Sequence, residues 1–254
     1  MKTRSNWLIL LIITFLSCNL YAGDKTSFLK KQFTTSNGYK LNYRILYPLN
    51  YSPDKQYPVI LFLHGAGEKG SDNEAQLLHG GDMFASYENQ SNYPAEGETW
   101  APYLNPSQNN GKREFPYSAP ATKAMKAVKE MLDSYIDKGI VDTKRIYITG
   151  LSMGGIGTFD VVCRYPNFFA AASPICGGVN LKRLENFKGK TGFSIYHGAA
   201  DDVVDPQFSR DAYATLQKIH ADVRYKEYPG VKHNSWDNAF AEPDYLKWMF
   251  QHSL

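Results

Sequence analysis

The feature that most constrains the fold is the pentapeptide Gly150-Leu151-Ser152-Met153-Gly154, which separates two segments of different periodicity. Residues 145–149 read Arg-Ile-Tyr-Ile-Thr, which is typical of a strand, and residues 155–164 are typical of a helix. A strand that passes directly into a helix needs a tight turn, and a side chain in place of either glycine would collide with the neighbouring strand or helix. The pentapeptide therefore predicts an α/β architecture in which the serine hydroxyl is lifted above the end of a sheet.

Further strands and helices alternate along the chain on both sides of this turn. The expected strands are residues 32–35, 40–47, 58–63, 145–149, 169–176, 193–197 and 223–228. The expected helices are residues 121–138, 155–164, 205–220 and 245–252. The first two strands flank an Asn37-Gly38 hairpin signal. The order predicts a mostly parallel central sheet with helices on both faces, interrupted by a long polar loop from Gly81 to Glu114.

The N-terminus has the layout of a secretory signal peptide. Lys2 and Arg4 precede an apolar stretch, residues 7–16, followed by small and polar residues. That stretch is shorter than the roughly 20 apolar residues that a membrane-spanning helix needs. We therefore expect export, with cleavage after Ala22.

This cleavage divides the chain into residues 1–22, the signal peptide, and residues 23–254, a single α/β domain. A retained membrane anchor and lipid attachment at Cys18 are the alternatives. The expected location is the periplasm or the medium, without stable membrane insertion once the signal is removed.

Composition narrows the possible partners and cofactors. The formal net charge is +3, from 28 basic and 25 acidic residues, and no basic run indicates a nucleic-acid or membrane-surface partner. Cys163 and Cys176 lie in the expected domain, where export permits a disulfide and their apolar surroundings equally suit buried free thiols. Neither has a metal-ligand spacing, so we expect no metal and no cofactor.

A serine hydroxyl becomes a good nucleophile only when a base takes its proton, so Ser152 requires a histidine. In folds with this turn, the chain order is serine, acid, histidine. The histidines that follow Ser152 are His197, His220, His233 and His252. His197 precedes the candidate acids, and His220 and His252 end helices. His233, in a loop directly after the last expected strand, is the predicted base.

The candidate acids lie together after the strand 193–197. Asp205 precedes Pro206, which suits the first position of a helix, so its expected role is to cap that helix. Asp201 and Asp202 both lie close enough to the strand end to reach an imidazole. The residues alone do not separate these two.

The carbonyl oxygen that turns negative during acyl transfer needs preorganised hydrogen-bond donors. The backbone N–H of Met153 is one candidate, because it directly follows the nucleophile. The second is expected in the loop after the strand 58–63, where Gly65-Ala66-Gly67 provides flexible backbone. We predict that the N–H of Ala66 is this donor.

Four ordered segments, residues 63–73, 150–155, 197–201 and 233–236, together resemble a known group of enzymes. They are similar to bacterial α/β-hydrolase esterases of the phospholipase/carboxylesterase and prolyl-oligopeptidase-like group. Acetyl xylan and feruloyl esterases and polyhydroxybutyrate depolymerase-like proteins are related to this group. The resemblance covers residues 59–250 and implies the α/β-hydrolase fold.

The resemblance also implies site residues and an activity. It places the acid at Asp201 and the oxyanion donor at Ala66. It implies hydrolysis of carboxylic esters in small molecules or polysaccharides, acetyl or feruloyl esters among them. The sequence departs from the group near residues 93–99, where a usual strand is not evident.

Two other functions are compatible with these residues. One is a serine peptidase of the prolyl-oligopeptidase type, although such enzymes carry a large gating domain for which this chain has no room. The other is a non-catalytic protein built on a decayed hydrolase scaffold.

Overall fold

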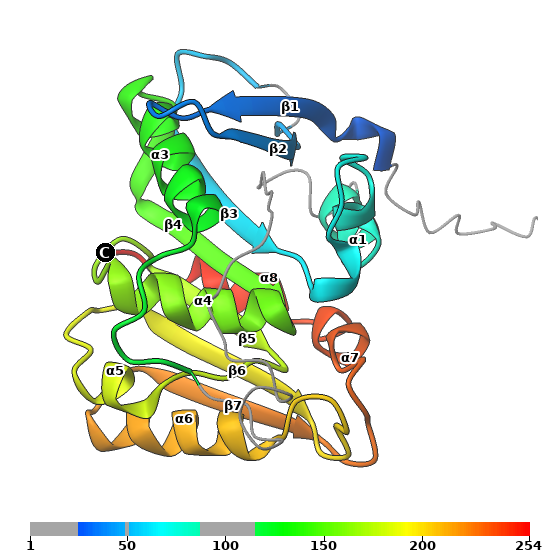
Figure 1. The fold of residues 1–254 in the computed structure, drawn as a ribbon, viewed down its shortest axis with the longest axis vertical. Helices are drawn as coiled ribbons and strands as arrows, with labels where there is room; N and C mark the ends of the chain where they lie inside the picture. The colour runs from blue at the N-terminus through cyan, green and yellow to red at the C-terminus, as the bar shows by residue number, and fades with distance from the viewer. Residues whose placement is uncertain (1–24, 49–50, 87–114) are drawn as a thin grey trace, which may run out of the picture.

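The computed structural model describes residues 25–48, 51–86 and 115–254 (Figure 1). Two sequence expectations lie outside these ranges: the N-terminal signal peptide with its lipid-attachment alternative, and the missing strand near residues 93–99. Within the described ranges, no helix is both long enough and apolar enough to span a membrane.

Among the residues that the structure describes, five strands form one parallel sheet, and their order in space, β3-β4-β5-β6-β7, follows their order in sequence. Their bounds are β3 Tyr57–Leu63, β4 Val141–Leu151, β5 Ala171–Ile175, β6 Gly192–Gly198 and β7 Val223–Tyr228. A separate antiparallel pair consists of β1 (Leu29–Thr34) and β2 (Lys40–Ile45). Because parallel strands end at the same edge of a sheet, the segments that follow β3, β4, β6 and β7 lie along one edge.

Helices cover both faces of the sheet. Their bounds are α1 Gly81–Ala85, α3 Lys123–Asp137, α4 Met153–Arg164, α5 Leu181–Glu185, α6 Gln207–Lys218, α7 Trp236–Phe240 and α8 Tyr245–Phe250. Three short 3-10 turns are Lys25–Ser27, Ala66–Glu68 and Ala75–Leu77. Helices α3, α4 and α6 pack on one face, whereas α1, α7 and α8 pack on the other (Figure 1).

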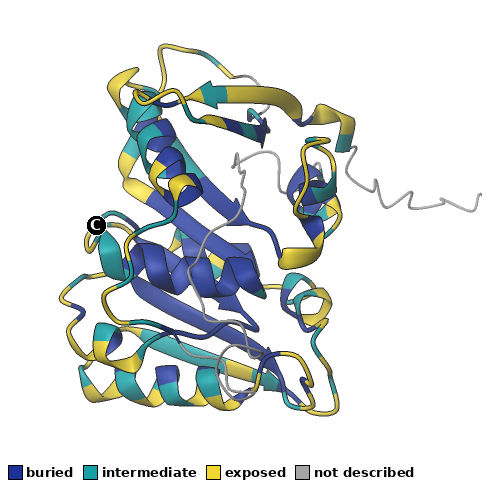
Figure 2. Ribbon diagram, in the orientation of Figure 1, coloured by how far each residue is buried: buried dark blue, intermediate teal, exposed yellow. Residues whose placement is uncertain are grey.

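Alternate residues of the central strands divide between two apolar cores. In β3, Leu61 and Leu63 face the core beneath α3, α4 and α6, whereas Ile60 and Phe62 face the core beneath α1, α7 and α8. Successive side chains of a strand point to opposite faces, so a strand buried on both faces is apolar throughout. Figure 2 shows the central strands buried along most of their length. This explains the uninterrupted apolar run at residues 58–63.

The ends of α3 show how local sequence sets helix boundaries. The hydroxyl oxygen of Thr122 accepts the N–H of Met125 at 3.1 Å, which satisfies one of the donors left open at a helix N-terminus. After the helix, Gly139 has a φ of +75°, a left-handed conformation that favours glycine and ends the helix.

All the expected strands and helices are present, with ends shifted by a few residues. The predicted loop from Gly81 to Glu114 is wrong at its start, where Gly81–Ala85 form α1. Helices α5 and α7 were not predicted, because five residues are too few to show a helical period.

Cys163 and Cys176 are free thiols, which answers the question that the sequence left open. Burial raises the pKa of the Cys163 thiol to about 12 and the pKa of the Cys176 thiol further still. Because the thiolate is the reactive form, both side chains are inert at neutral pH.

An apolar cavity of about 60 Å³ lies between the start of β3 and the second half of α3. Tyr51, Tyr57, Met131 and Tyr135 are among the residues that line it. This cavity is at the opposite end of β3 from the strand edge that carries the predicted site residues, so the site must be built from the residues of that edge.

Candidate active site

Ser152 occupies the turn between β4 and α4 in a conformation that most residues avoid. Its backbone angles are φ 54° and ψ −115°, and a positive φ is strained for any residue with a side chain. Its N–H donates to the carbonyl oxygen of Ile175 at 3.0 Å and lies 3.3 Å from Cys176 Sγ. Contacts of this kind hold the strained turn in place, and such strain is characteristic of functional sites.

The glycines around Ser152 are required by backbone contacts. A Cβ on Gly154 would lie 1.8 Å from the carbonyl oxygen of Leu63, and a Cβ on Gly150 would lie 2.6 Å from the same atom. A Cβ on Gly155 would lie 2.3 Å from the carbonyl oxygen of Ile175. The expectation that both flanking glycines make room is confirmed. Helix α4 thus begins in close contact with the ends of β3 and β5.

His233 lies in the loop after β7 and contacts both of its expected partners. Its Nε2 is 2.9 Å from Ser152 Oγ, and its Nδ1 is 2.8 Å from Asp201 Oδ2. An ionised carboxylate can only accept, so Nδ1 carries the proton and Nε2 is available to accept the serine proton. The imidazole is 18% exposed and the carboxylate 0%, so a substrate can reach the histidine but not the acid.

The Asp201 carboxylate accepts four hydrogen bonds. Oδ1 accepts the N–H groups of Val203 and Val204 at 2.8 and 2.9 Å. Oδ2 accepts from His233 at 2.8 Å and from His197 at 3.1 Å. Burial raises the pKa of this carboxyl, but the hydrogen bonds outweigh burial and hold the pKa well below its ordinary value. Asp201 is therefore ionised at neutral pH.

The neighbouring acids have other partners. Asp202 is exposed and forms an ion pair with Lys232 Nζ at 2.7 Å. The Asp205 carboxylate accepts the N–H of Gln207 at 2.9 Å, so it contacts the start of α6 as expected, although Pro206 and not Asp205 occupies the N-cap position and Gln207 is the first helical residue. Of the two acids that spacing could not separate, the structure brings Asp201 to the imidazole.

The other histidines after Ser152 are used differently. His220 follows α6 with a φ of 58°, and His252 Nε2 lies 3.0 Å from an oxygen of Asp222. His197 is fully buried beneath Asp201, in a position that the sequence order did not indicate.

The two expected oxyanion donors lie on adjoining segments. Ala66 is the first residue of the 3-10 turn after β3, and Met153 is the first residue of α4. The first N–H groups of a helical turn have no acceptor within that turn. The backbone of Leu63 packs against Gly154, so the two segments meet beside Ser152.

His64 has a role that sequence reasoning did not anticipate. Its buried Nδ1 lies 2.7 Å from the carbonyl oxygen of Gly65. Burial lowers the pKa of His64, so the ring is neutral at pH 7 and Nδ1–H donates to that carbonyl. In a trans peptide the C=O and the following N–H point in opposite directions. The contact therefore fixes where the N–H of Ala66 points.

An aromatic side chain, that of Trp236, packs beside the imidazole of His233. The Trp236 ring meets His233 edge-on, with centroids 5.5 Å apart, and its centroid also lies 4.9 Å from that of the His79 ring. Glu68 lies buried nearby, with Oε1 3.6 Å from His79 Nε2. Its other oxygen, Oε2, has no hydrogen-bond partner within the described ranges.

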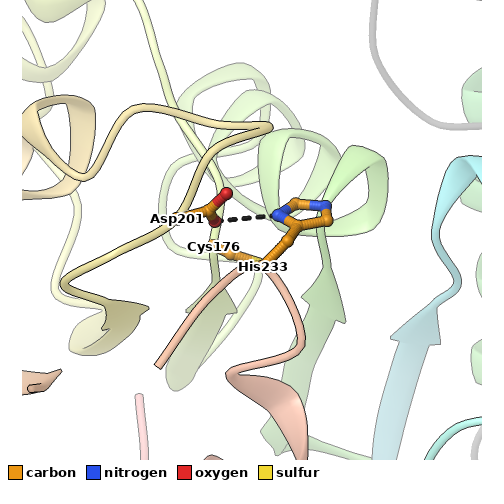
Figure 3. Close-up of side chains that lie close together, drawn as sticks. All are labelled: Cys176, Asp201 and His233. Atoms are coloured by element: carbon orange, nitrogen blue, oxygen red, sulfur yellow. Dashed lines mark hydrogen bonds and ion pairs between the residues drawn. The ribbon is translucent and has the colours of Figure 1, made fainter. Parts of the chain in front are cut away.

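Cys176, Asp201 and His233 place potential metal ligands within 4.8 Å of one another (Figure 3). However, the high pKa of the Cys176 thiol disfavours the thiolate that binds metals. Asp201 already accepts four donors, and His233 Nδ1 carries a proton directed at it. The donor set fits a hydrogen-bonded acid–base pair better than a metal centre.

The parallel sheet, the helices on both faces and the serine on a strained strand-to-helix turn define an α/β hydrolase. The sequence matches the Phospholipase/Carboxylesterase family over residues 50–243. The chain belongs to this family. The members of the family are serine hydrolases that act on carboxylic esters.

Three relatives illustrate the range of the similarity. A probable carboxylesterase of Oryza sativa subsp. japonica is 27% identical over 71% of this chain and 83% of its own length. A bifunctional acetylxylan esterase/xylanase of Neocallimastix patriciarum is 30% identical over 51% of this chain. An uncharacterized secreted protein of Arthroderma benhamiae is 26% identical over 78% of this chain. The chain spans only 19% and 23% of the latter two proteins.

A solved structure extends the likeness to the fold. The crystal structure of a thermostable esterase is 32% identical and superposes with a TM-score of 0.77. The match covers 90% of this chain and 64% of that one. The architecture described above is therefore that of an esterase fold.

Proposed function

We propose that this protein is a secreted serine esterase in which Ser152 is the nucleophile, His233 the general base and Asp201 the orienting acid. The observation that carries the proposal is the unbroken line of hydrogen bonds from Ser152 Oγ through the imidazole to the Asp201 carboxylate. This is the arrangement that activates a serine hydroxyl for acyl transfer.

The reaction proceeds in two halves. Ser152 Oγ bonds to the ester carbonyl carbon while its proton passes to His233 Nε2, and the tetrahedral intermediate collapses as His233 protonates the leaving alcohol. A water molecule then gives a proton to His233 and attacks the acyl group, which releases the acid and restores the serine. Asp201 stays ionised and stabilises the imidazolium that forms in each half.

The negative oxygen of each intermediate is bound by the N–H groups of Met153 and Ala66. Both are helix-start donors without an intrahelical acceptor, which supports this assignment. The contact between His64 and the Gly65 carbonyl oxygen orients the second donor before substrate arrives.

We further propose that the substrates are acetyl or feruloyl esters of polysaccharides. The alcohol accepts its proton from His233, so it lies beside Trp236, whose ring offers a flat apolar surface to a sugar or an aryl group. The acetylxylan esterase relative supports the same class of substrate.

The location follows from the N-terminus. Residues 1–22 act as a cleaved signal, and residues 23–254 form the mature, single-domain enzyme in the periplasm or the medium. The secreted relative supports export. N-terminal sequencing of the protein recovered outside the cytoplasm should begin at Gly23, and an intact Met1 or a lipidated Cys18 would contradict cleavage at this point.

The test of the nucleophile is hydrolysis of p-nitrophenyl acetate by the wild type and by Ser152→Ala. We expect kcat/KM to fall about 10⁵- to 10⁶-fold with an unchanged circular dichroism spectrum. Undiminished hydrolysis by the variant would refute the assignment. A panel of acetylated and feruloylated oligosaccharides against simple short-chain esters then tests the substrate class, which a preference for the simple esters would contradict.

A further inference from the structure

His197 is the penultimate residue of β6 and is fully buried. Its Nε2 lies 3.1 Å from Asp201 Oδ2 and 2.9 Å from the carbonyl oxygen of Val204. Its Nδ1 lies 2.7 Å from the hydroxyl of Ser209 on α6. The ring thus contacts the strand end, the loop that carries the candidate acid, and the helix that follows.

The partners of His197 fix the proton on its Nε2. A carboxylate and a peptide carbonyl can only accept, so Nε2 must carry a proton and donate to both Asp201 and Val204. Nδ1 faces the Ser209 hydroxyl, which can donate or accept and whose oxygen also lies 3.4 Å from the carbonyl oxygen of Gly177.

The contact with Asp201 falls on the atom that matters for catalysis. Oδ2 is the same oxygen that accepts His233 Nδ1–H. The other oxygen, Oδ1, is held by the N–H groups of Val203 and Val204. Without the Nε2–H of His197, Oδ2 would be held by His233 alone, and the carboxylate could rotate together with the imidazole that it has to orient.

We propose that His197 is a positioning residue, which fixes Asp201 Oδ2 opposite His233 Nδ1 through its own Nε2–H. It does not touch the substrate. Its bond to the Val204 carbonyl closes the loop from residue 201 to residue 204, and its bond to Ser209 fixes the ring against α6. The catalytic consequence of this role rests on the proposed esterase function.

The experiment uses two matched substitutions of His197 in the full chain. In His197→Gln the amide nitrogen falls near the position of Nε2, so the donor to Asp201 is kept. In His197→Asn the amide falls near Nδ1, so the contact with Ser209 is kept and the donor to Asp201 is lost. Each variant is assayed with p-nitrophenyl acetate, and its thermal midpoint is measured.

We expect His197→Asn to lower kcat about tenfold to a hundredfold with little change in KM, because the substrate still binds but the base is poorly oriented. His197→Gln should restore kcat to within severalfold of the wild type. Equal losses in both variants, or kcat in the Asn variant equal to that of the wild type, would overturn the proposal, because the role would then be packing alone.

A second readout does not depend on ester hydrolysis. The His233 Nδ1 proton bound to Asp201 should give a low-field proton resonance in the wild type and in His197→Gln, and it should be shifted or broadened in His197→Asn. If the wild type neither hydrolyses esters nor reacts with a fluorophosphonate, the proposed function fails. The resonance still decides the role of His197, and an identical signal in all three proteins would overturn it.

Discussion

Two loops at the same edge of the sheet differ in how many of their polar groups are hydrogen-bonded. In the acid loop, residues 199–206 after β6, the Asp201 carboxylate accepts four hydrogen bonds. Two come from backbone N–H groups and two come from imidazoles. The oxyanion loop, residues 64–70 after β3, leaves the N–H of Ala66 without an acceptor in its own turn. In this loop Glu68 Oε2 also has no partner within the described ranges.

This difference in hydrogen bonding matches the stage of the proposed reaction at which each loop acts. In the proposed mechanism Asp201 is ionised and aligned before a substrate arrives, so its hydrogen bonds are made within the protein. The proposed oxyanion donors bind an oxygen that develops its negative charge only during the reaction, so they need to be oriented but have no acceptor within their own helical turns. The hydrogen bond from His64 Nδ1 to the Gly65 carbonyl oxygen fixes the direction of the Ala66 N–H without itself accepting from that N–H.

Of these two loops, the acid loop gives the larger predicted effect. Asp201→Asn should lower kcat about 10⁴-fold, because an amide at this position favours the wrong imidazole tautomer. Asp202→Asn is the matched control one residue further, where the exposed side chain forms an ion pair with Lys232 and does not contact His233 in the structure. It should leave kcat within twofold. Comparable losses in the two variants, measured by p-nitrophenyl acetate hydrolysis, would mean that the wrong acid has been assigned.

The second prediction concerns the contact between Gly154, in the serine turn, and the end of β3. In Gly154→Ala the new Cβ would lie 1.8 Å from the Leu63 carbonyl oxygen, so we expect a loss of about 4 kcal/mol or more of unfolding free energy. Gly67→Ala, in the oxyanion loop, meets nothing within 4 Å and should change the unfolding free energy by about 0.5 kcal/mol or less. Urea denaturation measures both. A stable Gly154→Ala protein would show that the turn is not confined as described.

The oxyanion loop is tested at His64. His64→Leu removes the donor to the Gly65 carbonyl, so kcat should fall about tenfold to a hundredfold while the hydrogen bonds of His233 to Ser152 and Asp201 remain. His64→Asn places an N–H near the position of Nδ1 and should recover most of this loss. If the two variants are equally impaired, the hydrogen bond does not orient the Ala66 peptide.

The smallest effect concerns the pH dependence of stability. The hydrogen bonds of Asp201 hold its pKa below the value in the unfolded chain. The contribution of the ionised Asp201 carboxylate to the unfolding free energy is therefore complete above about pH 4, and it is lost as the pH falls through the folded-state pKa. The difference in unfolding free energy between the wild type and Asp201→Asn should therefore narrow below about pH 4. A difference that widens as the pH falls from 5 to 3 would contradict the assigned direction.

The sequence predicts features that depend on neighbouring residues better than features that depend on how distant segments pack. The turn at Ser152, the strands and the longer helices follow from periodicity and from glycine placement. Chain order together with the loop position after the last strand predicts His233. Spacing does not separate Asp201 from Asp202, because both follow the strand closely; the family resemblance favours Asp201, and in the structure only its carboxylate contacts the imidazole of His233.

His64 and His197 show what lies beyond such reasoning. Their partners are a peptide carbonyl, a carboxylate and a hydroxyl whose positions depend on how strands, loops and α6 pack together. Chain order excludes His197 as the base, because it precedes the acid. Chain order does not exclude a histidine that donates a hydrogen bond to the acid, and that contact appears only in the folded structure.

Reaction of the folded protein with a fluorophosphonate, followed by peptide mass spectrometry, tests directly whether Ser152 is an activated nucleophile. We expect a covalent adduct on Ser152 and its loss in His233→Ala, because the hydroxyl attacks only when the imidazole takes its proton. A folded wild-type protein that stays unmodified, or that carries the adduct at another residue, would show that Ser152 is not the activated nucleophile.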